Sequence, residues 1–260
     1  MGHSQIGTLP VTRRWKEVVR LIADGANVEA VAEATLLAAE RALASVREDA
    51  GFREAAKLLV EIGLAAGSDN PREALAGLGI PLSEETTVAG LAVAVGEVLD
   101  RRCEALRRPS DFGEMAGRAL VAAMIEGVRG HEATFFPRAG KEVGAVFVKV
   151  GREKGFGEMA RSFFGRLTGD CLDYFLSKTL GTKLGEGQRF ATNNQLAEFM
   201  GAMRTHCAEA SGITEKYAGQ WFSKHRHEEG GKISGESAEG FGWYAMEKMR
   251  LELEVRAKKS

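Results

Sequence analysis

The segment His225-Arg226-His227-Glu228-Glu229 brings two imidazoles and two carboxylates into five residues. Both groups are common zinc ligands, so His225 and His227 are candidate metal ligands. Positions two apart do not share a helix face, however, so one ion would need further ligands from elsewhere in the chain. The alternative is a solvated helix end beside a glycine-rich loop.

The three cysteines, Cys103, Cys171 and Cys207, could include a nucleophile activated by His131 or His206. His206 and Cys207 are neighbours in sequence, and neighbouring side chains diverge on a helix. Cys171 and Cys207 fall on apolar stripes, where a buried, unreactive thiol is the usual outcome. Three cysteines at irregular spacing do not form a disulfide framework, so we expect buried thiols in a reducing cytoplasm.

Asp170 and Asp173 lie three residues apart, which places both carboxylates on one face of a helix. Paired carboxylates can perform acid–base or metal chemistry. The same spacing also serves to solvate a helix surface or to pair with a lysine. A metal-dependent enzyme using these aspartates and the two histidines is therefore one hypothesis, and no catalytic residue or cofactor is assigned.

A basic region extends over residues 138–189, with ten Lys/Arg against six Asp/Glu. Phe156, Phe163 and Phe164 are interleaved with it, which suits a nucleic-acid backbone with stacked bases. The same aromatic residues fall on an apolar stripe, a position that favours the protein core over base stacking. GREKGFG at 151–157 lacks the Lys-Ser/Thr ending of a phosphate loop. The candidate contacts are Arg138, Lys141, Lys149, Arg152, Lys154, Arg161 and Arg166.

The chain starts Met1-Gly2, a dipeptide from which methionine is normally removed to expose the Gly2 amine. Myristoylation requires Ser or Thr at the sixth position, where this chain has Ile6, so a lipid anchor is disfavoured. We expect residues 1–11 to form a flexible tail, with Gly2 as a modification or docking site.

Helix-period apolar spacing recurs from Trp15 to about Val255, and 44% of the residues are hydrophobic. This pattern predicts an all-α fold, an irregular bundle of about ten helices. Val143–Val150 is β-branched, but a lone strand would have nothing to pair with, so we expect helix there as well. Glycines 155, 165 and 169 should weaken the long helix over 156–180. Expected helix starts are Thr12, Asn27, Asn70-Pro71, Asp111 with Glu114 as a capping box, and Thr192 or Asn193.

Arg107–Ser110 is the best candidate linker, which would divide the chain into helical lobes at 12–108 and 109–260. Residues 1–100 hold 9 Lys/Arg and 15 Asp/Glu, whereas residues 101–260 hold 26 and 21. Two lobes of opposite charge would attract each other, although a basic second lobe would also suit an anionic partner. Apolar runs are too short to span a bilayer and no signal peptide is visible, so we expect a cytoplasmic protein.

Three stretches carry a family resemblance: MGHSQIGTLP at the start, GFGEMARSFFGRLT at 155–168 and AGQWFSKHRHEEGG at 218–231. Together they resemble a bacterial family of uncharacterised helical proteins associated with anti-phage defence islands. The Met-Gly start is similar to that of the QatB component of the Qat system, which acts beside an ATPase, a QueC-like enzyme and a TatD-like nuclease. That resemblance implies modification of Gly2 by the QueC-like enzyme. The chain lacks the long Pro/Gly-rich N-terminal segment expected of QatB, and no catalytic residue is carried over.

The leading hypothesis is a non-catalytic adaptor or scaffold subunit of a bacterial multi-protein complex in phage defence. Its partners would be proteins of the same operon, and homo-oligomers would also be compatible with the sequence. Nucleic-acid binding through the basic 138–189 region is the first alternative. The metal-dependent enzyme is the second alternative.

Overall fold

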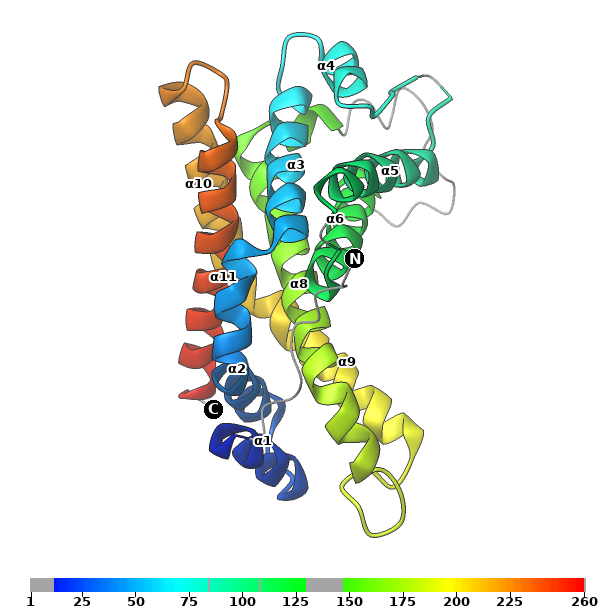
Figure 1. Ribbon diagram of the computed structural model, residues 1–260, viewed down its shortest axis with the longest axis vertical. Helices are drawn as coiled ribbons and strands as arrows, with labels where there is room; N and C mark the ends of the chain where they lie inside the picture. The colour runs from blue at the N-terminus through cyan, green and yellow to red at the C-terminus, as the bar shows by residue number, and fades with distance from the viewer. Residues whose placement is uncertain (1–11, 84, 108, 130–146, 260) are drawn as a thin grey trace.

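The computed structural model of the protein describes residues 12–83, 85–107, 109–129 and 147–259 (Figure 1). These residues form ten α-helices and two 3₁₀ segments, and an isolated β-bridge joins Leu184 and Phe190. The predicted all-α multi-helix bundle is therefore confirmed. The helices are α1 (Arg13–Ala23), α2 (Val28–Ala44), α3 (Ala50–Ala66), α4 (Pro71–Gly77), α5 (Val88–Leu106), α6 (Asp111–Arg129), α8 (Glu153–Leu180), α9 (Asn193–Ala210), α10 (Gly212–Glu228) and α11 (Gly235–Ala257).

Side-chain caps start four of these helices where the sequence predicts them. Thr12 Oγ1 accepts a hydrogen bond from the Trp15 amide at 3.2 Å, and Asn27 Oδ1 accepts one from the Ala30 amide at 3.0 Å. Thr192, rather than Asn193, caps α9. Each of these oxygens pairs with a backbone N–H that has no partner inside its own helix.

The predicted capping box at Asp111 and Glu114 is wrong. Ser110 Oγ accepts from the Gly113 amide at 2.9 Å, so Ser110 is the cap and Asp111 is the first residue of α6. The Asp111 carboxylate instead accepts a hydrogen bond from the Tyr174 hydroxyl at 2.9 Å. A serine directly before the helix reaches the same amides, which leaves the aspartate to join α6 to α8.

Helix α8 lies at the centre of the bundle, with α10 and α11 on one side and α5 and α6 on the other (Figure 1). The Phe156 ring of α8 stacks on Phe222 of α10 with 4.1 Å between ring centroids. Buried apolar side chains from Trp15 to Leu253 belong to one continuous hydrophobic cluster. Helices from both halves of the chain therefore share this core, and the division into two lobes stays a prediction.

Glycines allow α8 and α10 to approach each other closely. A Cβ atom on Gly157 would lie 2.5 Å from the Glu215 carbonyl oxygen, and one on Gly219 would lie 2.7 Å from that of Glu153. A Cβ atom on Gly165 would lie 2.8 Å from the Ser211 hydroxyl oxygen, a side-chain atom. Although the sequence suggests local weakening at glycines, α8 is continuous over 28 residues. The lost helix propensity is offset by backbone-to-backbone packing that any larger residue would block.

The β-branched segment at 143–150 is helical where the structure describes it, at residues 147–150. Residues 143–146 lie outside the described residues. Phe147 and Val150 are buried in the shared core. Among the described helices, none is long and apolar enough to cross a membrane.

Candidate functional site

The outer face of α11 is the candidate site, and it is positioned by the opposite face of the same helix. Ser234 Oγ caps α11 by accepting from the Ser237 amide at 3.1 Å. Phe241, Ala245 and Met249 recur every four residues and are buried in the core. This spacing fixes the rotation of the helix about its axis and decides which side chains point outward.

A salt-bridge cluster holds the start of α11 against α3. Glu239 accepts from Lys57 Nζ at 2.6 Å and also pairs with Arg53. Burial alone would raise the pKa of the Glu239 carboxyl, but the two cations outweigh burial and lower it. The cluster therefore favours the ionised carboxylate at neutral pH and helps to fix α11 in place.

Three apolar side chains of α11 remain exposed and lie on one side of the helix. Tyr244 is 62% exposed, Leu251 46% and Val255 44%. With Lys248 they occupy positions separated by four, three and four residues, which is the spacing of a coiled-coil seam. We call Tyr244, Lys248, Leu251 and Val255 the outer stripe. Exposed apolar residues at regular helical spacing are typical of a surface that packs against another helix.

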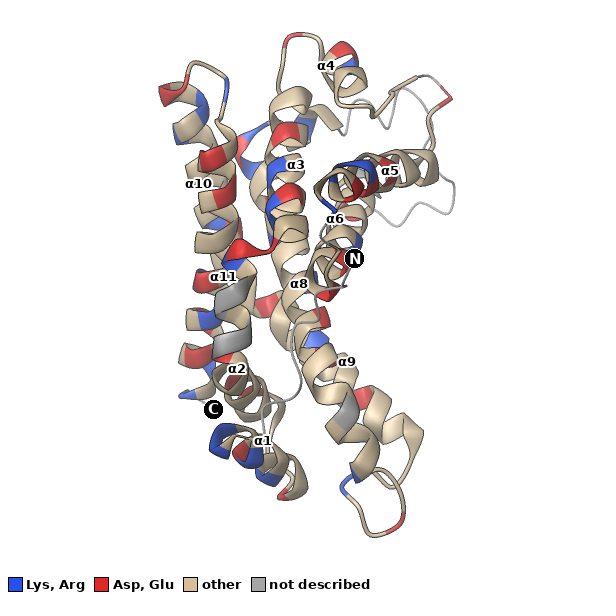
Figure 2. Cartoon of the chain, in the orientation of Figure 1, with Lys and Arg blue, Asp and Glu red and all other residues tan. Residues whose placement is uncertain are grey.

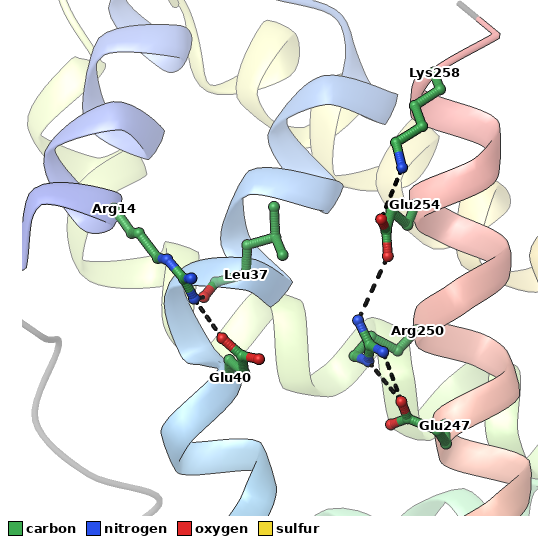
Figure 3. Close-up of polar contacts among 7 residues, drawn as sticks. All are labelled: Arg14, Leu37, Glu40, Glu247, Arg250, Glu254 and Lys258. Atoms are coloured by element: carbon green, nitrogen blue, oxygen red, sulfur yellow. Dashed lines mark hydrogen bonds and ion pairs between the residues drawn. The ribbon is translucent and has the colours of Figure 1, made fainter.

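Charged side chains of α11 at positions next to the outer stripe form pairs along the helix, and Figure 3 shows these pairs. Arg250 contacts Glu247 at 2.6 Å and Glu254 at 3.5 Å, and Lys258 contacts Glu254 at 2.8 Å. These pairs are intrahelical, at i,i+3 and i,i+4 spacing, so they contribute little to stability. They do leave the stripe with a polar edge whose opposite charges neutralise each other, as at the rim of a protein interface.

Lys248, within the stripe, is held to the neighbouring helix. Its Nζ atom lies 5.0 Å from the centroid of the Tyr217 ring on α10. Tyr217 in turn stacks on Phe241, and burial raises the pKa of its hydroxyl to about 12. The tyrosine is therefore neutral at physiological pH, and the cation contacts its ring face rather than a phenolate.

The two candidate metal ligands point to different surroundings. His225 Nδ1 lies 2.9 Å from the Trp221 carbonyl oxygen, and its ring stacks on Trp221. His227 is exposed at the end of α10, whereas Arg226 between them turns inward to the Gly67 and Gly151 carbonyl oxygens. Across the described parts of the chain, no three His, Cys, Asp or Glu side chains are grouped to hold a metal ion.

Cys171 and Cys207 are buried, as predicted, and burial raises the pKa of each thiol to about 12. Thiols with such pKa values stay protonated and are poor nucleophiles. Cys103 departs from the prediction because it is only half-buried. His131 lies outside the described residues, so its proposed role beside a cysteine stays a prediction.

One member of the aspartate pair, Asp173, is held by an arginine. Asp173 accepts a hydrogen bond from Arg204 Nε at 2.9 Å, an ion pair between α8 and α9. Burial nevertheless raises the pKa of the Asp173 carboxyl, although Arg204 acts in the opposite direction. The contacts of Asp173 fit the expected alternative of charge pairing, with an arginine in place of the lysine.

Some cations of the basic region pair with carboxylates, and others are exposed to solvent. Arg161 lies 2.9 Å from Glu215, and Arg166 pairs with Glu126. Lys149, Arg152 and Lys154 are exposed around the start of α8, where Lys154 lies 3.7 Å from Glu158. Figure 2 shows acidic and basic residues mixed along the helices rather than separated by sign. The interleaved residues Phe156, Phe163 and Phe164 are fully buried and belong to the core.

Arg138 and Lys141, like Gly2, lie outside the described residues. The nucleic-acid contacts and the modification of Gly2 therefore stay predictions.

The outer stripe is not among the sequence predictions, because the buried and the exposed apolar residues of the last helix are of similar types. Its signal is the second apolar series at 244, 251 and 255, beside the buried series at 241, 245, 249 and 253.

Known family profiles, curated protein sequences and solved structures give no match to this chain.

Proposed function

We propose that this protein is a non-catalytic helical adaptor that binds an amphipathic helix of a partner protein along the outer stripe of α11. The observation that carries the proposal is the placement of Tyr244, Leu251 and Val255 at heptad spacing on a helix fixed by its buried face. A partner helix with apolar residues at matching spacing would cover these side chains. The paired charges beside the stripe would remain at the wet edge of the contact.

The size of the stripe favours one helix of a different protein over self-association. From Tyr244 to Val255 the helix rises by about 16 Å, or three turns. A stable interface usually buries roughly 800 Å² on each partner, more than three partly exposed side chains supply. The contact is therefore suited to a subunit that gains further support inside a larger assembly.

The identity of the assembly rests on the family resemblance. We propose that the partners are products of the same operon, that the complex acts in anti-phage defence in the bacterial cytoplasm, and that Gly2 is a modification or docking site. Intact-mass measurement of the protein from its native host tests the last point. An added mass that maps to the Gly2 amine supports it, and an unmodified glycine in the assembled complex contradicts modification.

The binding test compares two apolar-to-acidic substitutions at exposed positions. Leu251→Asp lies in the outer stripe, whereas Val93→Asp lies on α5 at a residue that is 60% exposed. Val93→Asp should change the free energy of unfolding by no more than about 0.5 kcal/mol, and Leu251→Asp should lower it by about 1 kcal/mol, because the fold covers slightly more than half of Leu251. Each variant is co-expressed with the neighbouring genes, and the affinity for any purified partner is then measured.

We expect Leu251→Asp to lower the affinity for the partner by about tenfold or more, because a carboxylate would be buried in an apolar contact. Val93→Asp should leave this affinity unchanged. Cross-linking from position 244 should reach an amphipathic helix of the same partner. Equal affinities for the two variants would contradict the proposal. Cross-links only between copies of this chain, with a dimer in solution, would replace it with self-association.

A further inference from the structure

An open groove with both polar and apolar lining lies between the turn joining α1 to α2 and one face of α9. Its volume is about 680 Å³, within the range of small-ligand sites. Helices α1, α2 and α9 lie at the same end of the bundle (Figure 1). The lining residues are Gly25, Ala26, Asn27, Val28, Glu29, Arg189, Ala202, Thr205, His206 and Glu209.

Arg189 forms a cationic end of the groove. Its guanidinium lies 4.8 Å from the centroid of the Phe199 ring and donates to the Ile22 and Ala26 carbonyl oxygens at 3.0 and 2.7 Å. These contacts hold the side chain rigidly against the α1–α2 turn. A guanidinium has five N–H donors, so three remain for a bound anion, and a carboxylate matches their planar geometry.

His206 forms the other end, among acidic groups. The residue is 6% exposed, and its Nε2 atom has no hydrogen-bond partner among the described residues. Glu29, Glu209 and Arg256 are the charged groups that act on its ring. Arg256 also contacts Glu209 at 3.6 Å, so Glu29 supplies the main negative charge here. His206 lines the groove with the small part of its surface that remains exposed, so its ring can report a ligand bound beside Glu29.

The two ends are separated along α9. Phe199, beneath Arg189, and His206 are two helical turns apart, a rise of about 10 Å. An extended peptide covers about 3.3 to 3.6 Å per residue, so about three residues span this separation. A carboxylate at one end and an ammonium group at the other would match the groove in both charge and length.

We propose that the groove binds a short, extended peptide with free ends, its carboxylate at Arg189 and its ammonium group at Glu29 and His206. The ammonium donates to the Glu29 carboxylate and lies beside the His206 ring. The peptide backbone lies along α9 beside Ala202 and Thr205. The site shares no residue with the outer stripe, although Arg256 of α11 contacts Glu209 in its lining, and it would allow the adaptor to bind a small ligand.

Triglycine is the minimal probe, and its end-capped forms are the matched controls. Histidine side-chain NMR signals are followed during titration with triglycine, N-acetyl-triglycine and triglycine amide, with His206 assigned through His206→Gln. We expect saturable shifts at His206 with triglycine. Blocking either end should weaken binding by about tenfold, because each end loses a charge-assisted hydrogen bond.

Glu29→Gln and Glu33→Gln make a matched pair, since both residues are half-buried on α2 and only Glu29 lines the groove. Glu29→Gln should lower the affinity for triglycine by about tenfold. It should leave the affinity for N-acetyl-triglycine unchanged, because the acetylated end carries no charge. Glu33→Gln should have no effect on either peptide. Absence of a saturable shift, equal affinity for all three peptides, or equal effects of the two variants would each overturn the proposal.

Discussion

Two arginines bridge backbone carbonyls in regions of opposite character. Arg226 donates to the Gly67 and Gly151 carbonyl oxygens where α3, α8 and α10 meet. Arg189 donates to the Ile22 and Ala26 carbonyl oxygens beside the open groove at α9. An arginine that donates to two backbone carbonyls therefore lies at a closed junction in one region and in the wall of a groove in the other.

Backbone approach separates the two regions. At the closed junction a Cβ atom on Gly151 would lie 2.1 Å from the Gly67 amide nitrogen, so only glycine permits the contact. On α9, a Cβ atom on Gly201 would meet nothing within 4 Å. Glycine at the junction lets helices exclude water, whereas α9 keeps open space along its outer side. The closed region supplies stability and the open region supplies surface for binding.

The largest effect on stability is expected when the same substitution is made at two helical glycines, one in each region. Gly219→Ala should destabilise the protein by about 2 to 3 kcal/mol, because the new methyl group meets the Glu153 carbonyl. Gly201→Ala should stabilise it by about 0.5 to 1 kcal/mol through higher helix propensity. Urea denaturation measures both changes. A destabilising Gly201→Ala, or a neutral Gly219→Ala, would remove the distinction between closed and open regions.

Replacing each arginine by methionine sharpens the comparison further. Arg226→Met should cost about 2 kcal/mol, because it leaves two carbonyls without donors at a tightly packed junction. Arg189→Met should cost about 1 kcal/mol, because water in the groove can replace its donors. The difference in thermal unfolding midpoint between the two variants gives the result. Equal losses of stability in the two variants would show that water does not reach the Arg189 carbonyl partners any more than it reaches those of Arg226.

A smaller effect should appear in the pH dependence of stability. Burial lowers the pKa of His206 below 6.5, Arg256 adds to the shift, and Glu29 and Glu209 oppose it. The His206 ring therefore binds a proton more readily in the unfolded chain than in the folded protein. Its contribution to the free energy of unfolding is complete above about pH 6.5 and falls as the pH drops toward the folded-state pKa. His206→Gln should lose less stability than the parent protein on acidification, measured by urea denaturation. A parallel loss in both proteins would contradict the expected shift.

The smallest expected effect on stability concerns the exposed cations at the start of α8. Charge reversal at Arg152 and Lys154 should change the free energy of unfolding by less than about 0.5 kcal/mol each. The same variants decide the nucleic-acid alternative, with Arg161→Glu added. Salt-dependent binding to a DNA duplex that falls on reversal supports that alternative. Binding that does not respond to these charges would dismiss it.

Helix boundaries were within reach of the sequence because their causes are local. Thr12 and Asn27 each cap the amide three residues ahead, and Pro71 begins α4 after Asn70. The error at Asp111 has the same origin, since Ser110 and Asp111 are both good caps and geometry chooses between them. Burial of Cys171 and Cys207 followed from their apolar stripes.

The sequence by itself determined that this chain forms amphipathic helices, because a repeat near 3.6 residues and capping side chains act within a few residues. Tertiary structure alone decided which of two apolar series on α11 faces the core, because that depends on contacts with α3 and α10. It also decided that Arg161 pairs with Glu215 and that Glu29 and His206 line the same groove. Such pairs join residues far apart in the chain, and no local pattern encodes the distance between them.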